Sequence, residues 1–328
     1  MGVSGYQGDW ESFVLTPYHL DIYSRVPTPS SEGVMKHHFQ AHAFAFSLLI
    51  PAFVLIVGVA LLPAAQTLWT SLYKVSMILP GAEYVGLENY SRLLDDGRFW
   101  NAWENTLYFT VASVVGETLL GLAIALVLSQ DFPLRGLVRA AVLVPWAIPT
   151  VVSSRLWGLI FNTDFGIANY LLRSVGIIET DKNWLGEIGW ALNVTVLVDV
   201  WKTTPFMALL IMAGLSTIPG DLYEAARVDG ATMLQRFFQI TVPLLLPVML
   251  VAIMLRALDA FRVFDVIYVM TGGGPADSTE VMSTLTYKVL FSATQFGYGS
   301  TLAGAMFMTL LGVSLVFLFM LRNRLEVE

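Results

Sequence analysis

The sequence predicts an all-α protein that crosses a lipid bilayer about six times. Hydrophobic residues make up 56% of its 328 residues and charged residues only 13%. That charged share is about half that of an ordinary soluble domain. Six runs are long and apolar enough to cross the hydrocarbon core, which needs about 20 helical residues. These observations exclude a soluble globular protein.

The six predicted spans differ in the charges and prolines they contain. They are residues 43–73, 106–129, 140–161, 190–214, 242–270 and 300–321. The first and last contain no charged residue, the second contains only Glu117, and the third only Arg155. Pro145, Pro149 and Pro205 are expected to break or kink helices where they fall inside spans, because proline lacks the amide hydrogen that a helix uses.

The regions outside the spans complete the predicted organisation. Residues 1–42 form a polar N-terminal tail, residues 43–322 a membrane domain, and residues 323–328 a short C-terminal tail. The N-terminal tail lacks the basic patch and short apolar stretch of a secretory signal. Its three histidines have no fourth ligand, so we expect a solvated tail rather than a metal site. They are His37, His38 and His42.

Charge, cysteine content and missing motifs exclude several function classes. The formal net charge is −7, the opposite of a nucleic-acid-binding footprint. There are no cysteines, which excludes disulfide frameworks, thiolate metal sites and thiol catalysis. The patterns G-x-x-x-x-G-K-[ST], H-E-x-x-H and G-x-S-x-G are also absent from the sequence. We therefore expect neither an enzyme nor a cofactor or metal site on this chain.

The distribution of lysine and arginine predicts the orientation in the membrane. The loops 130–139, 215–241 and 322–328 hold six of these residues in 44 positions. The loops on the other side hold six in 89 positions. Because cytoplasmic loops are enriched in basic residues, we expect the first set, and both termini, in the cytoplasm.

The cytoplasmic loop at residues 215–241 reads as two short helices. Asp221 is placed to cap the first, with Glu224 three residues later completing a capping box. Asp229 and Gly230 are expected to end it, since glycine tolerates the left-handed conformation of a helix stop. A second helix from Ala231 carries an apolar stripe of Leu234, Phe237, Phe238 and Val242. Either this stripe docks on a partner, or the segment is a hairpin lying on the membrane surface.

The same loop carries a spaced pattern that resembles a known family. The pattern consists of Glu224, Ala225, Ala226, Asp229, Gly230, Ala231, Phe237, Ile240, Pro243 and Pro247. It is similar to the EAA loop of permease subunits of binding-protein-dependent ABC importers, with Val242 where leucine is usual. Residues 85–90, 271–275 and 296–300 look like the carbohydrate-uptake branch of that family. Residues 201–207 and 256–262 are similar to its trehalose- and maltose-type permeases.

The resemblance implies a type I ABC importer permease that imports a disaccharide such as trehalose or maltose. It implies four kinds of contact: a second homologous permease, two cytosolic ATPase subunits that hold ATP and Mg²⁺, an extracytoplasmic sugar-binding protein, and the bilayer of the bacterial inner membrane. The residues at the ATPase contact would be Glu224, Ala225, Ala226, Asp229, Gly230 and Ala231. ATP-driven closure of the ATPases would then switch the permeases between inward-facing and outward-facing states.

Three predicted spans place a charge near the middle of the membrane. Glu117 lies roughly 18 Å from either end of its span, while Asp199 and Arg256 lie roughly 14 Å deep. In the fifth span Arg256, Asp259, Arg262 and Asp265 alternate in sign every three residues. Such neighbours are at contact distance on a helix. One interpretation is therefore a ladder of ion pairs that neutralises itself, with Asp199 and Lys202 as a second, smaller pair.

The other interpretation is that these groups border a translocation pathway. Sugar hydroxyls need alternating donors and acceptors, and charged groups at this depth usually face a bundle interior or a wet cavity. The candidate pathway residues are Glu117, Asn193, Asp199, Lys202, Thr203, Arg256, Asp259, Arg262 and Asp265. Pairing across a subunit interface is a third interpretation. Trp146, Trp157 and Phe261 are candidates for stacking on a sugar ring.

An ion-coupled secondary sugar transporter, with Glu117 and Asp199 carrying protons, is the alternative function. The absence of a visible inverted repeat and the presence of the EAA loop argue against it.

Overall fold

The computed structural model describes residue 46, residues 48–76 and residues 81–325, with side chains described as far as residue 322. The chain divides into two compact units, residues 1–64 and residues 65–328. The predicted N-terminal tail with its three histidines lies outside the described residues. The first described span is one helix, Leu48–Thr70, which is π-helical at Ile56–Leu61 and continues as α2 (Leu62–Thr70).

Five helices of the described part are long and apolar enough to cross a membrane, and there are six such segments if a bent pair of helices is counted as one span. Besides the first span, they are α4 (Gly97–Leu128), α8 (Ala191–Leu215), the helix Met233–Phe261 and the helix Phe296–Arg322 within α14 (Phe296–Leu325). The bent pair is α5 (Arg135–Ala147) and α6 (Thr150–Ile160). The predicted all-α architecture of about six spans is confirmed.

The third span, predicted at residues 140–161 with a break or kink at its prolines, consists of two helices. Helices α5 and α6 meet at an angle of 90°. Between them Ile148 has extended backbone dihedrals of −72° and 132°. Because Ile148 precedes Pro149, clash with the proline ring disfavours the helical conformation there. Of the three prolines expected to break helices, Pro149 produces the break, while Pro145 and Pro205 lie inside α5 and α8.

The fifth span begins and ends earlier in the chain than the predicted residues 242–270, since it is the helix Met233–Phe261. Helix α11 (Val242–Phe261) follows the short α10 (Met233–Arg236) and a π-helical turn at Phe237–Thr241. It ends at Phe261, and α12 (Asp265–Met270) is a separate helix. The hydroxyl of Ser283 donates a hydrogen bond to the carbonyl of Val263, which lies in the gap between these two helices.

The second span is longer than predicted at its start. Helix α4 begins at Gly97 instead of residue 106, because Asp96 caps it by accepting a hydrogen bond of 2.9 Å from the backbone amide of Arg98. The remaining elements are short. They are β1 (Tyr73–Val75) and β2 (Ala82–Tyr84), which pair antiparallel, α3 (Glu88–Asp95), α7 (Ile167–Ser174), α9 (Gly220–Val228) and α13 (Met282–Tyr287), which continues as a π-helical turn at Lys288–Ser292.

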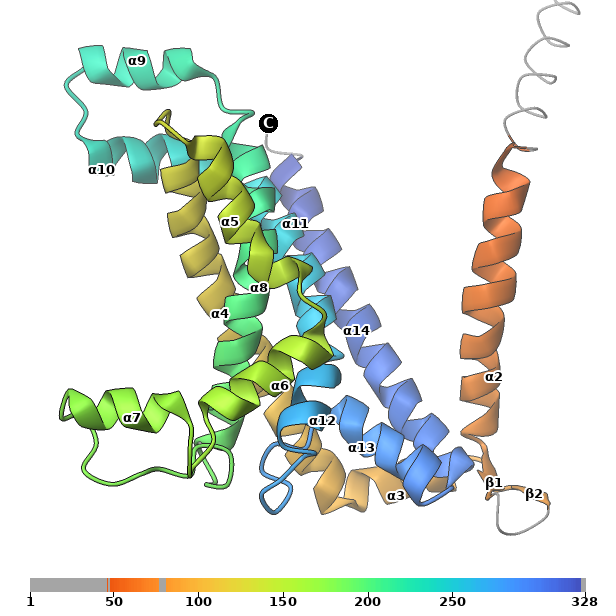
Figure 1. Cartoon of the computed structure of the whole chain (residues 1–328). Coiled ribbons are helices and arrows are strands. Elements are labelled where there is room, and N and C mark those ends of the chain that lie inside the picture. The colour runs from red at the N-terminus through yellow and green to blue at the C-terminus, as the bar shows by residue number, and fades with distance from the viewer. Residues whose placement is uncertain (1–45, 47, 77–80, 326–328) are drawn as a thin grey trace, which may run out of the picture. The chain divides into compact units, whose positions relative to one another are not determined.

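Within residues 65–328, α4, α8 and α11 form the packed centre. Their buried apolar side chains make two clusters, one around Phe109 and Val198 and one around Met207 and Leu245. Figure 1 shows α9, α10 and the connection from α4 to α5 at one end of this bundle, with α3, α7, α12 and α13 at the other. Connections therefore alternate between two ends, as expected for a chain that crosses a membrane repeatedly.

Candidate functional site

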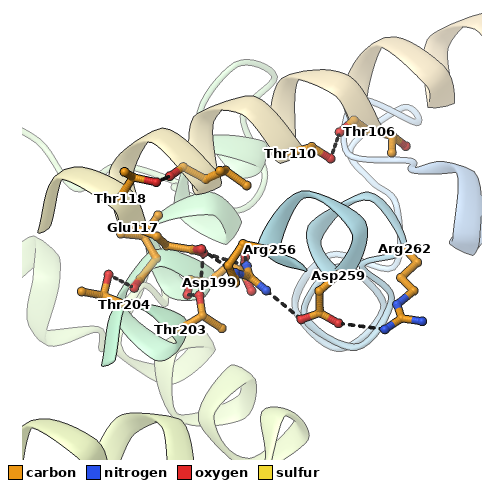
Figure 2. Close-up of polar contacts among 12 residues, drawn as sticks. Thr106, Thr110, Glu117, Thr118, Asp199, Thr203, Thr204, Arg256, Asp259 and Arg262 are labelled. Atoms are coloured by element: carbon orange, nitrogen blue, oxygen red, sulfur yellow. Dashed lines mark hydrogen bonds and ion pairs between the residues drawn. The ribbon is translucent and has the colours of Figure 1, made fainter. Parts of the chain in front are cut away.

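Arg256 of α11 is the centre of an ion-pair cluster that joins three helices (Figure 2). Its Nε and Nη2 atoms donate hydrogen bonds of 2.5 and 2.7 Å to the two carboxylate oxygens of Glu117 on α4. Its Nη2 atom also lies 3.1 Å from Asp199 Oδ2 on α8, and its Nη1 atom 2.7 Å from Asp259 Oδ2. One guanidinium is therefore shared by three carboxylates.

The cluster has a buried side and an exposed side. The side chains of Glu117 and Arg256 are 0% and 3% exposed, and that of Asp199 is 12% exposed. The hydroxyl of Thr203 donates to Glu117 Oε1 over 2.5 Å, so both oxygens of this carboxylate are occupied. Asp259, by contrast, is 59% exposed and lies 3.4 Å from the exposed Arg262. The buried side fits the predicted structural role, whereas the exposed side is accessible to a ligand.

A cavity of about 450 Å³ lies against this exposed side. Its size falls in the range of roughly 300 to 1,000 Å³ that is usual for small-molecule sites. Seven of the nine predicted pathway residues line it: Asp199, Lys202, Thr203, Arg256, Asp259, Arg262 and Asp265. The wall thus mixes donors and acceptors, which hydroxyl-rich ligands require.

The other two predicted pathway residues do not line the cavity. Glu117 lies buried behind Arg256. Asn193 accepts a hydrogen bond of 2.5 Å from the hydroxyl of Tyr108 and donates one of 2.5 Å to the carbonyl of Gly189. The four-charge ladder is wrong in part, because α11 ends at Phe261 and Asp265 belongs to α12. Arg256, Asp259 and Arg262 still form two consecutive ion pairs.

Lys202 does not pair with Asp199 as predicted. Its ammonium group donates hydrogen bonds of 2.7 Å to the carbonyl of Ile148 and 3.3 Å to the carbonyl of Trp146. These carbonyls lie at the end of α5, where a helix leaves its last acceptors without partners. Lys202 therefore stabilises the break between α5 and α6.

The break also brings residues to the cavity that charge patterns did not indicate. Trp146 and Thr150, on either side of it, line the cavity, and so does Phe264. Trp146 is 49% exposed and stacks on Phe206. Of the three aromatic residues considered for stacking on a sugar ring, Trp146 is the one at the cavity, since Phe261 is buried and Trp157 stacks on Phe161. In the sequence, Pro149 was the residue that indicated the break which brings Trp146 and Thr150 to the cavity.

The predicted loop of two short helices is confirmed as α9 and α10, at the end of the bundle remote from α12 (Figure 1). Helix α9 ends in a Schellman motif. The amide of Ala231 bonds to the carbonyl of Ala226 at 2.9 Å, and that of Gly230 to Arg227 at 3.1 Å. Gly230 has a φ of +78°, the left-handed conformation that favours glycine.

The start of α9 differs from the prediction, and the start of α10 carries a cap that sequence reasoning missed. Pro219, with no side-chain hydrogen bond, caps α9, and Asp221 lies in its first turn. The predicted Asp221–Glu224 capping box is therefore wrong. The capping box of this loop is instead formed by Thr232 and Gln235, which exchange hydrogen bonds at the start of α10.

The loop exposes apolar side chains that a protein in water would bury. Val228 is 88% exposed, Met233 76%, Leu234 69% and Phe238 64%. The hydroxyls of Tyr223 and Thr241, 2.9 Å apart, fasten α9 to the base of α11. An exposed apolar surface of this kind is typical of a contact with another protein or with the membrane, the two interpretations of this loop.

The sequence matches a family of transport proteins and several curated relatives. The family described as binding-protein-dependent transport system inner membrane component matches residues 117–324. The trehalose/maltose transport system permease protein MalF of Thermococcus litoralis is 42% identical over 283 residues, covering 86% of this chain and 95% of the relative. The trehalose transport system permease protein SugA of Mycobacterium tuberculosis is 39% identical over 275 residues, covering 84% and 87%. The sulfoquinovosyl glycerol transport system permease protein SmoG of Agrobacterium fabrum is 38% identical over 282 residues, covering 85% and 91%.

A solved structure shares the fold. It is a chain of a bacterial ABC transporter involved in the import of the acidic polysaccharide alginate, with a TM-score of 0.73 and 20% identity, covering 88% of this chain and 98% of that one. The candidate membrane helices and the matching family identify a membrane transport protein of the permease class. The chain belongs to the family of inner membrane components of binding-protein-dependent transport systems. The resemblance in the EAA loop is thereby confirmed.

Proposed function

We propose that this chain is the membrane-spanning permease subunit of an ATP-driven sugar importer and forms half of the pathway for a disaccharide of the trehalose or maltose type. The observation that carries the proposal is the polar cavity bounded by Asp199, Lys202, Arg256 and Asp259. The relatives named for trehalose, maltose and sulfoquinovosyl glycerol transport support a sugar as the cargo.

In this proposal the cavity contacts the sugar through its exposed charges. Asp259 and Arg262 provide an acceptor and a donor at the surface of the cavity, and Trp146 provides an aromatic face. Glu117 and the buried part of Arg256 position these groups without contacting the sugar. Asn193 lies in the first turn of α8, where it bonds to Tyr108. It is proposed to border the pathway at that end of the helix.

The α9–α10 segment is proposed to couple the cavity to ATP hydrolysis on partner subunits. Glu224, Asp229 and Gly230, together with Ala225, Ala226 and Ala231, would contact one of two cytosolic ATPases, which hold ATP and Mg²⁺. The exposed apolar side chains from Val228 to Phe238 support this contact. Because Tyr223 fastens α9 to the start of α11, movement of the segment would shift the helix that carries Arg256 and Asp259.

The remaining partners follow from this assignment. The assembly would contain a second homologous permease and receive its sugar from an extracytoplasmic binding protein. It would lie in the bacterial inner membrane with α9 and α10, and both termini, in the cytoplasm. Proton coupling through Glu117 is disfavoured, because both of its oxygens accept hydrogen bonds and its side chain is fully buried.

The pathway role is tested by replacing Asp259 with asparagine. In proteoliposomes that contain the complete transporter, Asp259→Asn is expected to lower ATP-dependent sugar uptake by about 10-fold to 100-fold, the effect of losing one hydrogen bond to a charged group. Thermal stability should change little, since the side chain is mostly exposed. Asp95→Asn, an exposed carboxylate on α3, is the control. Normal uptake by Asp259→Asn with lowered stability would assign Asp259 to the ion-pair cluster alone.

The coupling role is tested with Glu224→Lys and Gly230→Pro. Proline cannot adopt the φ of +78° found at residue 230, and lysine reverses the charge of an exposed residue on α9. Both variants should lose sugar-stimulated ATP hydrolysis while the isolated chain still folds. Glu104→Lys is the control, because Glu104 is exposed and lies near the start of α4, at the end of the bundle remote from α9. This variant should retain sugar-stimulated ATP hydrolysis. Hydrolysis unaffected by either substitution would contradict the docking role.

A further inference from the structure

A second cavity of about 450 Å³ lies outside the pathway, at the end of the bundle that carries α13. We call it the Glu280 pocket. Its lining includes Glu280, Asp277, Lys288, Arg98, Leu285 and Val289. None of these residues lines the pathway cavity. The proposed transport function therefore leaves this pocket unexplained.

Glu280 is buried in this pocket with half of its carboxylate unpaired. Its side chain is 3% exposed, and one oxygen, Oε2, accepts a hydrogen bond from the ammonium group of Lys288. The other oxygen, Oε1, is buried and has no hydrogen-bond partner among the described residues. Because buried polar atoms in folded proteins are almost always hydrogen-bonded, this oxygen requires a donor from outside the chain.

The surrounding backbone holds Glu280 in this position. Asn105 of α4 donates a hydrogen bond of 2.9 Å to the carbonyl of Glu280, and Asn101 donates one of 2.7 Å to the carbonyl of Asp277. The hydroxyls of Thr271 and Thr279 lie 2.7 Å apart and close the loop between α12 and α13. The unpaired oxygen is thus part of a preformed site.

The glycine-rich part of this loop packs directly on the Glu280–Lys288 pair. A Cβ atom added at Gly273 would overlap the carboxylate of Glu280 and the ammonium group of Lys288. The φ of Gly273 is +93°, a conformation that L side chains rarely adopt. The backbone therefore closes one side of the ion pair, so a donor for Oε1 must come through the pocket.

The charges and the apolar wall define the chemistry of the missing donor. The lining charges balance, with Asp277 and Glu280 against Arg98 and Lys288, and the unpaired atom is a carboxylate oxygen. Such an oxygen accepts hydrogen bonds, so the missing group is a donor and not an anion. No group of three potential metal-ligating side chains occurs in the described part of the chain. The buried Leu285 and Val289 suit the aliphatic stem of a lysine or arginine, whose charged head seeks a carboxylate.

We propose that the Glu280 pocket is a docking socket for a lysine or arginine side chain of a protein that approaches this end of the bundle, with Glu280 Oε1 as its acceptor. The socket stands on its own geometry and does not depend on the identity of the transported sugar. The test below measures binding of a cation to the Glu280 pocket and not sugar uptake. A negative result would therefore contradict the socket without contradicting the proposed transport function.

The test uses the purified full chain in lipid nanodiscs and measures binding by saturation-transfer NMR. The probes are methylguanidinium, its neutral analogue methylurea, and the peptides acetyl-Gly-Arg-Gly-amide and acetyl-Gly-citrulline-Gly-amide. Methylguanidinium and the arginine peptide should bind the wild-type chain, and each should bind at least about tenfold more tightly than its neutral analogue, as expected for a charge-assisted hydrogen bond. Binding should fall by a similar factor in Glu280→Gln.

Glu179→Gln, an exposed carboxylate in the connection between α7 and α8, is the matched control and should bind like the wild type. Glu280→Asp keeps the negative charge. If loss of charge causes the weaker binding of Glu280→Gln, Glu280→Asp should bind methylguanidinium more tightly than Glu280→Gln does. Thermal unfolding of each variant accompanies the titrations. Equal binding of methylguanidinium to wild type and Glu280→Gln, or no binding at all, would overturn the socket. Binding of free methylguanidinium without the arginine peptide would overturn a protein side chain as its occupant.

Discussion

Arg256 of α11 and Glu117 of α4 form an ion pair with two hydrogen bonds, of 2.5 and 2.7 Å, and both side chains are almost completely buried. The same guanidinium bonds to Asp199 of α8, so one cation connects the three helices that form the packed centre. Charged side chains inside a membrane protein are costly unless they are paired or solvated. Arg256 therefore holds α4, α8 and α11 together and also holds the exposed Asp259 in position.

Removal of the guanidinium should strongly destabilise the bundle. Arg256→Met leaves Glu117 and Asp199 buried without their cation, and breaking a buried pair in this way costs about 3–5 kcal/mol. Arg262→Met is the control, because Arg262 is 63% exposed and pairs with the exposed Asp259, so its effect should be below about 1 kcal/mol. Thermal unfolding of the purified chain in detergent compares the two. Adding Glu117→Met to Arg256→Met should restore part of the lost stability, and equal stability of the two single variants would refute the central role of Arg256.

Lys202 should control the angle between α5 and α6. Replacing it with methionine removes the donor to the carbonyls of Ile148 and Trp146, while Lys202→Arg keeps one. The chain has no native cysteine, so spin labels can be attached at Leu137→Cys on α5 and Leu159→Cys on α6, both exposed positions. Pulsed electron paramagnetic resonance should give a broader distance distribution for Lys202→Met than for wild type or Lys202→Arg. An unchanged distribution would show that Pro149 alone sets the break.

Asp96 should make stability depend on pH in the acid range. Burial raises the pKa of Asp96, but hydrogen bonds from Arg98 and from the hydroxyl of Tyr298 outweigh burial and hold the pKa below its ordinary value of 3.8. A lowered folded-state pKa contributes stability above the unfolded pKa, about 3.9, and this stability is lost as the pH falls through the folded value.

Asp96→Asn isolates this contribution, because asparagine also caps helices but does not titrate in this range. Thermal unfolding of wild type and variant is compared from about pH 6 to about pH 3. The wild type should be the more stable at the upper end, and the difference should shrink as the pH falls. A difference independent of pH would contradict the proposed ionisation of Asp96.

The approximate number of spans and the two short helices of the loop at residues 215–241 could be predicted from the sequence, because both depend on local patterns. Apolar runs and the Asp229–Gly230 stop act over a few residues, and Gly230 adopts the expected left-handed conformation. Long-range partners could not be predicted in the same way. Lys202 and Asp199 are three residues apart and were expected to pair, but Asp199 bonds to Arg256, and Lys202 bonds to the broken end of α5.

The limits of the pathway prediction have a similar physical cause. Spacing along α11 indicated Arg256, Asp259 and Arg262 as neighbours, and their ion pairs follow the helix. The sequence did not indicate that Glu117 is enclosed behind Arg256 and away from the cavity, or that Asn193 bonds to Tyr108. Both depend on how α4 and α8 are rotated about their axes. Trp146 and Thr150 reach the cavity through the 90° bend, whose angle the sequence pattern does not specify.

Uptake of labelled trehalose or maltose by proteoliposomes of defined composition tests whether this chain carries sugar with energy from ATP. Uptake should require the partner ATPase subunits, ATP and the sugar-binding protein, and should persist when ionophores abolish proton and sodium gradients. Uptake by the permeases without the ATPases, driven by an ion gradient and abolished by ionophores, would contradict ATP-driven transport and favour an ion-coupled carrier.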